Sequence, residues 1–160
     1  MIKKDIQLAN AIQEARILGL FKTFCDKNST KDAQQRVRTI YSRTRNPIET
    51  TKNIFMNEFG ETISNSDADR LSILIFSFAQ KSIYRKSIDD SLKNSLLQSQ
   101  FHHCAICGCD IDIHAHADHI VPFKLVGDEL DNNLQMLCNN CNLKKNACLD
   151  YQIRFLLKLI

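Results

Sequence analysis

The segment that decides the fold of this chain begins with Cys104-Ala105-Ile106-Cys107 and ends with Cys138-Asn139-Asn140-Cys141-Asn142-Leu143-Lys144-Lys145. Between these two Cys-x-x-Cys pairs lies Ala117-Asp118-His119-Ile120-Val121-Pro122, and Asn133-Leu134-Gln135-Met136-Leu137 directly precedes the second pair. Six of the seven cysteines and all five histidines lie from His102 onward. The side chains suited to metal binding and acid–base chemistry are therefore gathered in the last third of the chain.

Two Cys-x-x-Cys pairs are typical of a closed, tetrahedral zinc site. We therefore predict that four thiolates hold a structural zinc ion: Cys104, Cys107, Cys138 and Cys141. Because the intervening segment is too small to bury a core of its own, the ion should supply much of its folding free energy. Two redox-active dithiols are an alternative, but the thioredoxin-like context is missing. Cys109 is an alternative to Cys107 with poorer spacing, and Cys25 and Cys148 receive no role.

The rest of the chain predicts a mainly helical α+β protein, with a helical region over residues 1–99 and a zinc-stabilised ββα unit over 100–160. Apolar periodicity, capping residues and Pro47 indicate helices over about 6–21, 31–45, 47–59, 67–84 and 88–98. The run Leu71–Ala79 is apolar nearly all round, which favours a central buried helix. After the first Cys-x-x-Cys pair we expect a strand over 111–119, a loop, a strand over 134–137, and a helix from 139 to about 148.

Composition narrows the cellular setting. The chain has no apolar segment near the roughly 20 residues of a membrane-spanning helix, and no signal-peptide pattern at its start. We therefore expect a cytoplasmic protein with reduced thiols. Residues 1–100 carry 16 Lys and Arg against 11 Asp and Glu, while residues 101–160 carry 5 against 7. This asymmetry suits a helical part that holds nucleic acid and a C-terminal part that holds cations.

The C-terminal block also contains the chemical groups that phosphodiester hydrolysis needs. A neutral histidine such as His119 is a suitable general base near pH 7. The Asp118 carboxylate and an asparagine amide are hard oxygen ligands, suited to Mg²⁺ or Mn²⁺. None of these residues would indicate a nuclease alone. Their joint occurrence at these spacings, framed by the cysteine pairs, makes the prediction.

The order of these motifs resembles the HNH endonucleases, whose ββα-metal units hydrolyse DNA. The resemblance implies that Asp118 is a ligand of the catalytic ion and that His119 is the general base. Asn133 would orient the loop that carries the base, and Asn142 would complete the metal site. Lys145 would lie near the substrate phosphate. This chain has Asn142 where many family members have histidine, and a neutral oxygen ligand favours Mg²⁺ or Mn²⁺ over softer ions.

Several positions keep alternatives. Asn132 is chemically identical to its neighbour Asn133. His116 should share the strand face of Asp118 and could touch the ion or the phosphate, although a solvent-facing histidine fits equally well. The remaining histidines, His102, His103 and His114, are expected at the surface or beside the zinc ligands.

Two further features concern partners. Arg36, Arg38, Arg43 and Arg45 form the densest basic run and could contact phosphates from one helix face, with a solvated helix face as the alternative. The C-terminal stretch from Leu149 places Ile153, Leu156, Leu157 and Ile160 on one helical face, which should dock on the helical region or form a dimer or heteromer contact.

Together these observations predict a metal-dependent HNH endonuclease that cuts DNA. The resemblance suggests a bacterial or phage restriction or defence nuclease, acting as a homodimer or with a partner protein. Two alternatives remain: a zinc-stabilised nucleic-acid-binding module without catalysis, and an RNA-cleaving effector.

Overall fold

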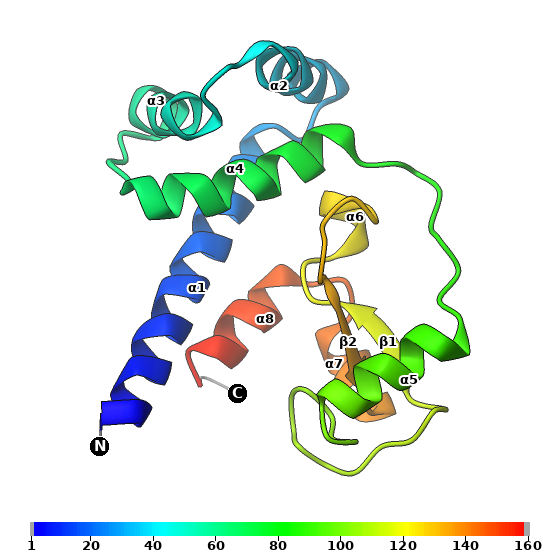
Figure 1. Cartoon of the computed structure of the whole chain (residues 1–160). Helices are drawn as coiled ribbons and strands as arrows, with labels where there is room; N and C mark the ends of the chain where they lie inside the picture. The colour runs from blue at the N-terminus through cyan, green and yellow to red at the C-terminus, as the bar shows by residue number, and fades with distance from the viewer. Residues whose placement is uncertain (1, 159–160) are drawn as a thin grey trace.

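In the computed structural model, residues 2–158 form eight helices and one two-stranded antiparallel sheet (Figure 1). The first five helices are α1 (Ile2–Lys27), α2 (Lys31–Arg43), α3 (Pro47–Phe59), α4 (Asn65–Gln80) and α5 (Asp90–Ser99). They are followed by β1 (His116–His119), α6 (Phe123–Val126), β2 (Leu134–Leu137), α7 (Asn139–Lys145) and α8 (Leu149–Leu156). The predicted α+β class, mainly helical with a small C-terminal ββα unit, is confirmed.

Local capping explains where the predicted helices begin and end. The Thr30 side chain accepts a hydrogen bond from the backbone of Ala33 at the start of α2. Asn46 does the same for α3, with Pro47 in the first turn, and Gly60 ends that helix with a left-handed φ of 70°. These short-range signals are present in the sequence, so the bounds of α2 and α3 were predictable to within about two residues.

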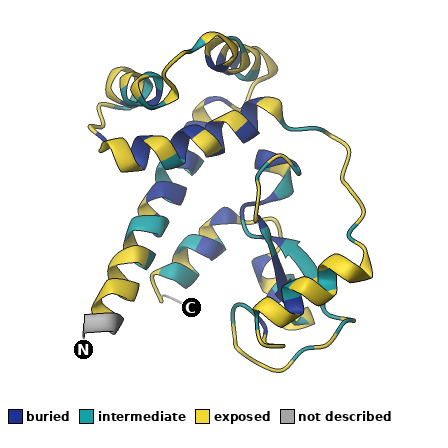
Figure 2. Ribbon diagram, viewed as in Figure 1, coloured by how far each residue is buried: buried dark blue, intermediate teal, exposed yellow. Residues whose placement is uncertain are grey.

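Aromatic side chains form the centre of the main core. Phe24 of α1 lies between the rings of Phe55 and Phe78, with centroid distances of 6.2 and 5.9 Å, and all three are buried. The long apolar stretch of α4 is buried along one side and packs against α1, α2 and α3 (Figure 2). The prediction of a central helix over this stretch is confirmed. Its buried side packs against three helices, whereas Ile73 and Phe76 on the other side are half-exposed.

The sheet is shorter than expected at its start. β1 and β2 pair antiparallel, with His119 opposite Leu134, but β1 begins only at His116. The predicted strand from residue 111 is wrong for its first five residues. The Asp112 side chain accepts a hydrogen bond from the backbone of His114, and its carbonyl accepts one from Ala115. These bonds turn the chain before the sheet starts.

The main core extends into the C-terminal unit. Val121, Val126 and Leu149 belong to the same buried cluster as the phenylalanines of α1, α3 and α4. α6 packs on α4, and α8 packs along α1, with Ile153 and Leu156 partly buried against the cluster. α5 instead packs on β2 (Figure 1). The expected docking of the C-terminal helix on the helical region is therefore seen, while Ile160 lies outside the described residues.

The fourth helix, α4, ends earlier than the predicted end near residue 84. α4 ends at Gln80, and residues 81–89 run as an extended segment toward the sheet (Figure 1). The Lys81 ammonium donates a hydrogen bond to the Lys124 carbonyl at 2.8 Å, so the segment is held against the C-terminal unit from its first residue. Among residues 2–158, no helix combines the length and the apolar character needed to cross a membrane.

Candidate active site and metal centre

The cysteines converge on one point. The sulfur atoms of Cys104, Cys107, Cys109 and Cys138 all lie within 4.8 Å of one another. Cys141, one helical turn after Cys138, lies close to this group. The cluster therefore contains the four predicted ligands and Cys109, whose sulfur lies 3.4 Å from that of Cys107. Four-thiolate coordination fits zinc, and the presence of a fifth thiol keeps the Cys109 alternative open.

Local backbone structure builds this cluster. The Cys104 amide donates to the Cys109 carbonyl, and Gly108 between them has a φ of 71°, so the first pair lies on a tight knuckle. Cys138 is the N-cap of α7 and accepts from the backbone of Cys141. A zinc ion here would tie the knuckle to the start of α7. Around it, Cys104, Leu137 and Cys141 form only a small apolar cluster.

The surroundings of Cys107 favour the form that binds metal. Backbone and side-chain hydrogen bonds from Cys109 lower the pKa of Cys107 to about 6. A thiol with this pKa is largely thiolate near neutral pH, and the thiolate is the metal ligand.

Three of the four predicted catalytic residues line one hollow, and Asn133 lies outside it. The hollow measures about 520 Å³ and takes Asp118 and His119 from the end of β1 and Asn142 from α7. His119 is only 3% exposed, whereas Asn142 is half-buried at the hollow. The other lining residues are Arg85, Pro122, Phe123, Lys124, Leu143, Lys145, Asn146 and Ala147. The short β1 strand and α7 thus bring residues more than 20 positions apart to a common surface.

Asn133 clamps the segment that follows His119. Its side-chain oxygen accepts from the Val121 amide at 2.7 Å, and its side-chain nitrogen donates to the Val121 carbonyl at 2.9 Å. Its own carbonyl accepts from Ile120 at 2.9 Å. Asn133 is buried, whereas Asn132 is exposed with a left-handed φ of 54°. Of the two neighbouring asparagines, Asn133 has the contacts that the role of loop orientation requires.

Lys145 is buried beside the Asp-His step and also lines the hollow, so its position near the substrate phosphate stays a prediction. It is fully buried, with its ammonium 2.7 Å from the Asp118 carboxylate and donating to the His119 carbonyl at 2.7 Å. The buried charge is therefore paired and hydrogen-bonded, as stability demands. Lys145 holds the backbone and the carboxylate of the Asp-His step in place.

The oxygen ligands at the hollow fit a divalent ion of the Mg²⁺ type. Asp118 supplies one carboxylate and Asn142 one amide oxygen, which are hard ligands. Because Lys145 already balances the Asp118 charge, the protein alone offers few ligands for the ion. Mg²⁺ is commonly bound through one or two carboxylates, water and substrate phosphates. An ion here would therefore bind together with its substrate.

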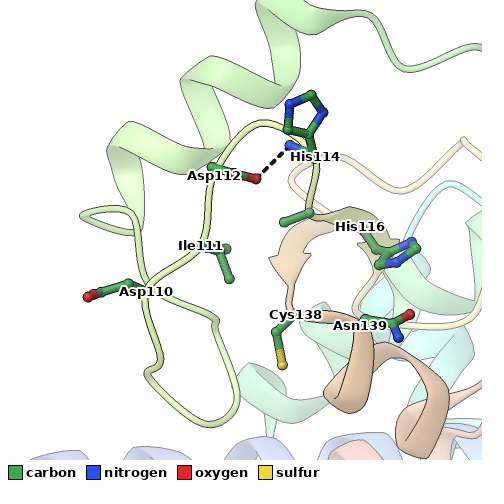
Figure 3. A pocket seen from close by; sticks show the side chains of 8 residues that line it. Asp110, Ile111, Asp112, His114, His116, Cys138 and Asn139 are labelled. Atoms are coloured by element: carbon green, nitrogen blue, oxygen red, sulfur yellow. Dashed lines mark hydrogen bonds between the residues drawn. The ribbon is translucent and has the colours of Figure 1, made fainter.

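His116 lies apart from this hollow. It lines a second hollow of about 480 Å³ with Asp112, His114 and Asn139, on the side of the sheet near Cys138 (Figure 3). The structure thus does not bring His116 to Asp118, although the two share strand parity. His114 and His116 are exposed, and His103 pairs with Asp110 at 2.9 Å near the knuckle.

The predicted basic face lies away from the candidate site. α2 packs on α4, and α4 separates it from α6 and the sheet (Figure 1). Arg38 donates to the Ala79 carbonyl at 2.8 Å near the end of α4, while Arg36, Arg43 and Arg45 are exposed. Phosphate binding by this face stays a prediction.

Two residues that sequence reasoning missed contact His119 directly. The Asp128 carboxylate lies 2.9 Å from His119 Nε2, and an Arg85 guanidinium nitrogen lies 3.1 Å from Nδ1. The Phe123 ring packs edge-on against the imidazole, with centroids 5.4 Å apart. Asp128 follows Gly127 in an ordinary loop pattern, and Arg85 is 34 positions before His119. Neither position had a local signal that could have identified it.

The comparisons with known proteins agree with this geometry. Residues 104–147 match the family model described as HNH endonuclease. The comparisons with curated proteins and with solved structures gave no match. The matched segment contains the cysteine cluster, both strands and α7. It supports a nuclease-type, metal-dependent function that acts on nucleic acid.

Proposed function

We propose that this protein is a metal-dependent endonuclease that hydrolyses phosphodiester bonds in DNA. The observation that carries the proposal is the convergence of Asp118, His119 and Asn142 on one hollow within the segment that matches the HNH family. A general base and hard oxygen ligands on a common surface are what hydrolysis of a phosphodiester requires.

The proposed mechanism is an in-line displacement. His119 takes a proton from a water molecule, and the resulting hydroxide attacks the phosphorus. The bond from phosphorus to the 3′-oxygen breaks, and the 3′-oxygen takes a proton from solvent. The ends formed are a 5′-phosphate and a 3′-hydroxyl, and His119 then returns its proton to solvent.

Other residues of the chain hold this arrangement. Asp118 and Asn142 would bind the Mg²⁺ or Mn²⁺ ion, which supplies charge stabilisation to the phosphate and the leaving oxygen. Asn133 holds the backbone after His119, and Lys145 holds Asp118. The zinc-binding cysteines would fix α7, and hence Asn142, relative to the knuckle.

Plasmid nicking tests the proposal. Wild-type protein should relax supercoiled plasmid in Mg²⁺ or Mn²⁺, and His119→Ala should reduce the rate about 10²- to 10⁴-fold, the usual contribution of a general base. His114→Ala is the matched control, because this exposed histidine lies outside the catalytic hollow. Zinc content should be unchanged in both variants. Equal cutting by His119→Ala would overturn the mechanism.

The same assay addresses the alternatives. Binding of DNA without any cutting by the wild type would indicate a zinc-stabilised binding module. Cutting of structured RNA with no cutting of DNA would indicate an RNA-cleaving effector. The DNA assignment rests on the family, since both nucleic acids have the phosphodiester that the site addresses.

We also propose a biological setting, namely a bacterial or phage restriction or defence nuclease. This part rests on the resemblance of small HNH proteins. One site cuts one strand per encounter, so a double-strand break requires a homodimer, a partner protein or successive nicks. Light scattering of the protein with and without DNA measures the assembly.

A further inference from the structure

The His119 imidazole is held at both of its nitrogens. Nε2 lies 2.9 Å from the Asp128 carboxylate, and Nδ1 lies 3.1 Å from the Arg85 guanidinium. The ring is buried, and Phe123 packs on it. The imidazole therefore has a single defined orientation, and that orientation depends on residues outside the Asp-His motif.

The chemistry of the two partners assigns the protons on the ring. A guanidinium can only donate hydrogen bonds, so Nδ1 facing Arg85 must be the unprotonated, accepting nitrogen. Nε2 then carries the hydrogen of the neutral ring and donates it to Asp128, which accepts when ionised. This tautomer leaves Nδ1 as the nitrogen with a lone pair for a proton from water.

Asp128 is itself held as a carboxylate. Burial opposes its charge, but a hydrogen bond from the Lys86 amide at 2.6 Å and the bond from His119 outweigh burial. The pKa of Asp128 therefore lies below its usual value. A carboxylate on one imidazole nitrogen fixes the tautomer and stabilises the imidazolium that forms when the other nitrogen takes a proton.

Arg85 comes from the connecting segment 81–89, at the mouth of the catalytic hollow. Its guanidinium lies 5.2 Å from the centre of the Phe123 ring, and it lines the hollow together with Asp118 and Asn142. The residue is exposed, so its charge is within reach of a ligand. Guanidinium pairs with phosphate through strong, often bidentate hydrogen bonds, far more strongly than with a neutral imidazole.

We propose that Asp128 is a positioning residue that presents Nδ1 of His119 as the proton acceptor, and that Arg85 binds the scissile phosphate. Without nucleic acid, Arg85 covers Nδ1. When the substrate binds, Arg85 moves onto the phosphate and exposes Nδ1 to the attacking water. The water proton then goes to Nδ1, its hydroxide bonds to phosphorus, and the departing 3′-oxygen takes a proton from solvent. The inference rests on the proposed nuclease function and assigns roles there to Asp128, to Arg85 and to Nδ1 of His119.

Nitrogen-15 NMR of the imidazole tests the tautomer directly. Two-bond proton–nitrogen correlations distinguish a neutral ring protonated at Nε2 from one protonated at Nδ1, with His119→Gln identifying the signals. The wild-type zinc-loaded protein should show the proton on Nε2. Asp128→Asn removes the carboxylate that fixes the proton on Nε2, but Arg85 still donates to Nδ1, so the shift toward protonation at Nδ1 is expected when Asp128→Asn is combined with Arg85→Ala. A wild-type ring protonated at Nδ1 would overturn the role of Asp128.

Cleavage kinetics separate positioning from general destabilisation. Asp128→Asn should lower kcat on the order of 10²-fold with KM nearly unchanged, and Asp128→Glu should recover part of the loss. Asp131→Asn, an exposed acid three residues later in the same loop, is the matched control and should cut as the wild type does. Normal kcat for Asp128→Asn refutes the proposal. If that variant does not fold, the wild-type tautomer and the Asp128→Glu kinetics decide.

DNA binding tests Arg85. Without added Mg²⁺ or Mn²⁺, Arg85→Ala should weaken binding of a DNA duplex roughly 10-fold, as expected for a lost charged hydrogen bond. It should also reduce the slope of affinity against salt by about one ion. Arg85→Lys should retain the slope, and Arg154→Ala on α8 is the exposed-arginine control. An unchanged slope in Arg85→Ala would refute phosphate binding.

These readouts keep the two proposals separable. If the wild type cuts neither DNA nor RNA, the proposed function fails, while the NMR and binding results still decide the roles of Asp128 and Arg85. If the wild type cuts DNA but Asp128→Asn and Arg85→Ala behave as wild type, only the further inference fails.

Discussion

In the helical region, buried phenylalanines from α1, α3 and α4 pack around Phe24. The segment 104–147 contributes Val121 and Val126 to this core, and its own apolar cluster, around Cys104, Leu137 and Cys141, is small. This segment also has polar contacts that are specific to single residues, such as the two Asn133 bonds to Val121. Many apolar side chains can fill a helical core, but few residues can replace a thiolate or an amide clamp. This difference explains why the sequence of the C-terminal segment indicates a function, whereas the sequence of the helical region does not.

Loss of zinc should have the largest effect, and it should affect the C-terminal segment but not the helical region. Structural zinc contributes apparent binding free energies of about 10–16 kcal/mol in small domains. Cys104→Ser should therefore disorder residues 104–147 while α1 to α4 remain helical. Elemental analysis and amide NMR spectra measure the two effects. Cys148→Ser, at an exposed cysteine, is the control and should keep one zinc per chain. A Cys104→Ser protein with one zinc per chain and sharp amide signals from residues 104–147 would contradict the assignment of Cys104 as a zinc ligand.

Removing the central aromatic ring, that of Phe24, should destabilise the helical region. Phe24→Ala should lower the free energy of unfolding by about 3–5 kcal/mol, because it leaves a cavity between Phe55 and Phe78. Urea unfolding followed by circular dichroism measures the change. Phe76→Ala is the matched control, because Phe76 is 50% exposed and should cost under about 1 kcal/mol. Similar losses in both variants would mean that the aromatic cluster is not the core that its burial indicates.

The smallest effect concerns the charge at the start of α4. Burial opposes ionisation of Asp67, but hydrogen bonds from Gln13 and Arg16 outweigh it and lower its pKa. The lowered pKa stabilises the fold above the unfolded-state value of about 3.9, and this contribution disappears as pH falls through the folded-state pKa. Asp67→Asn should cost about 1–2 kcal/mol at neutral pH.

The pH dependence of that cost is the sharper measurement. The difference in unfolding free energy between wild type and Asp67→Asn should shrink as the pH falls below about 4. Using the difference removes the effect of acid on the zinc ligands, which both proteins share. Asp69→Asn, an exposed neighbour, should show no such pH-dependent difference. A constant difference across this range would mean that the Asp67 charge is not what stabilises α4.

Much of the fold was predictable because the relevant forces act over a few residues. Thr30, Asn46 and Gly60 set helix ends by contacts to backbone groups one turn away. The prediction failed where a local side-chain bond competed with the strand, at Asp112, and where α4 gave way to the segment that docks on Lys124. In the first case an Asx-type turn outweighed the strand-like alternation. In the second case the chain leaves α4 and contacts a residue 43 positions away.

The sequence by itself identified the cysteine cluster and the segment that matches the HNH family model, because metal ligation demands particular side chains at particular spacings. Only the tertiary structure decided how His119 is held, because Arg85 and Asp128 reach it across 34 and 9 positions through a docked connecting segment. It also showed that Lys145 is a buried partner of Asp118. Such contacts depend on how separate elements pack, and no short-range pattern encodes that packing.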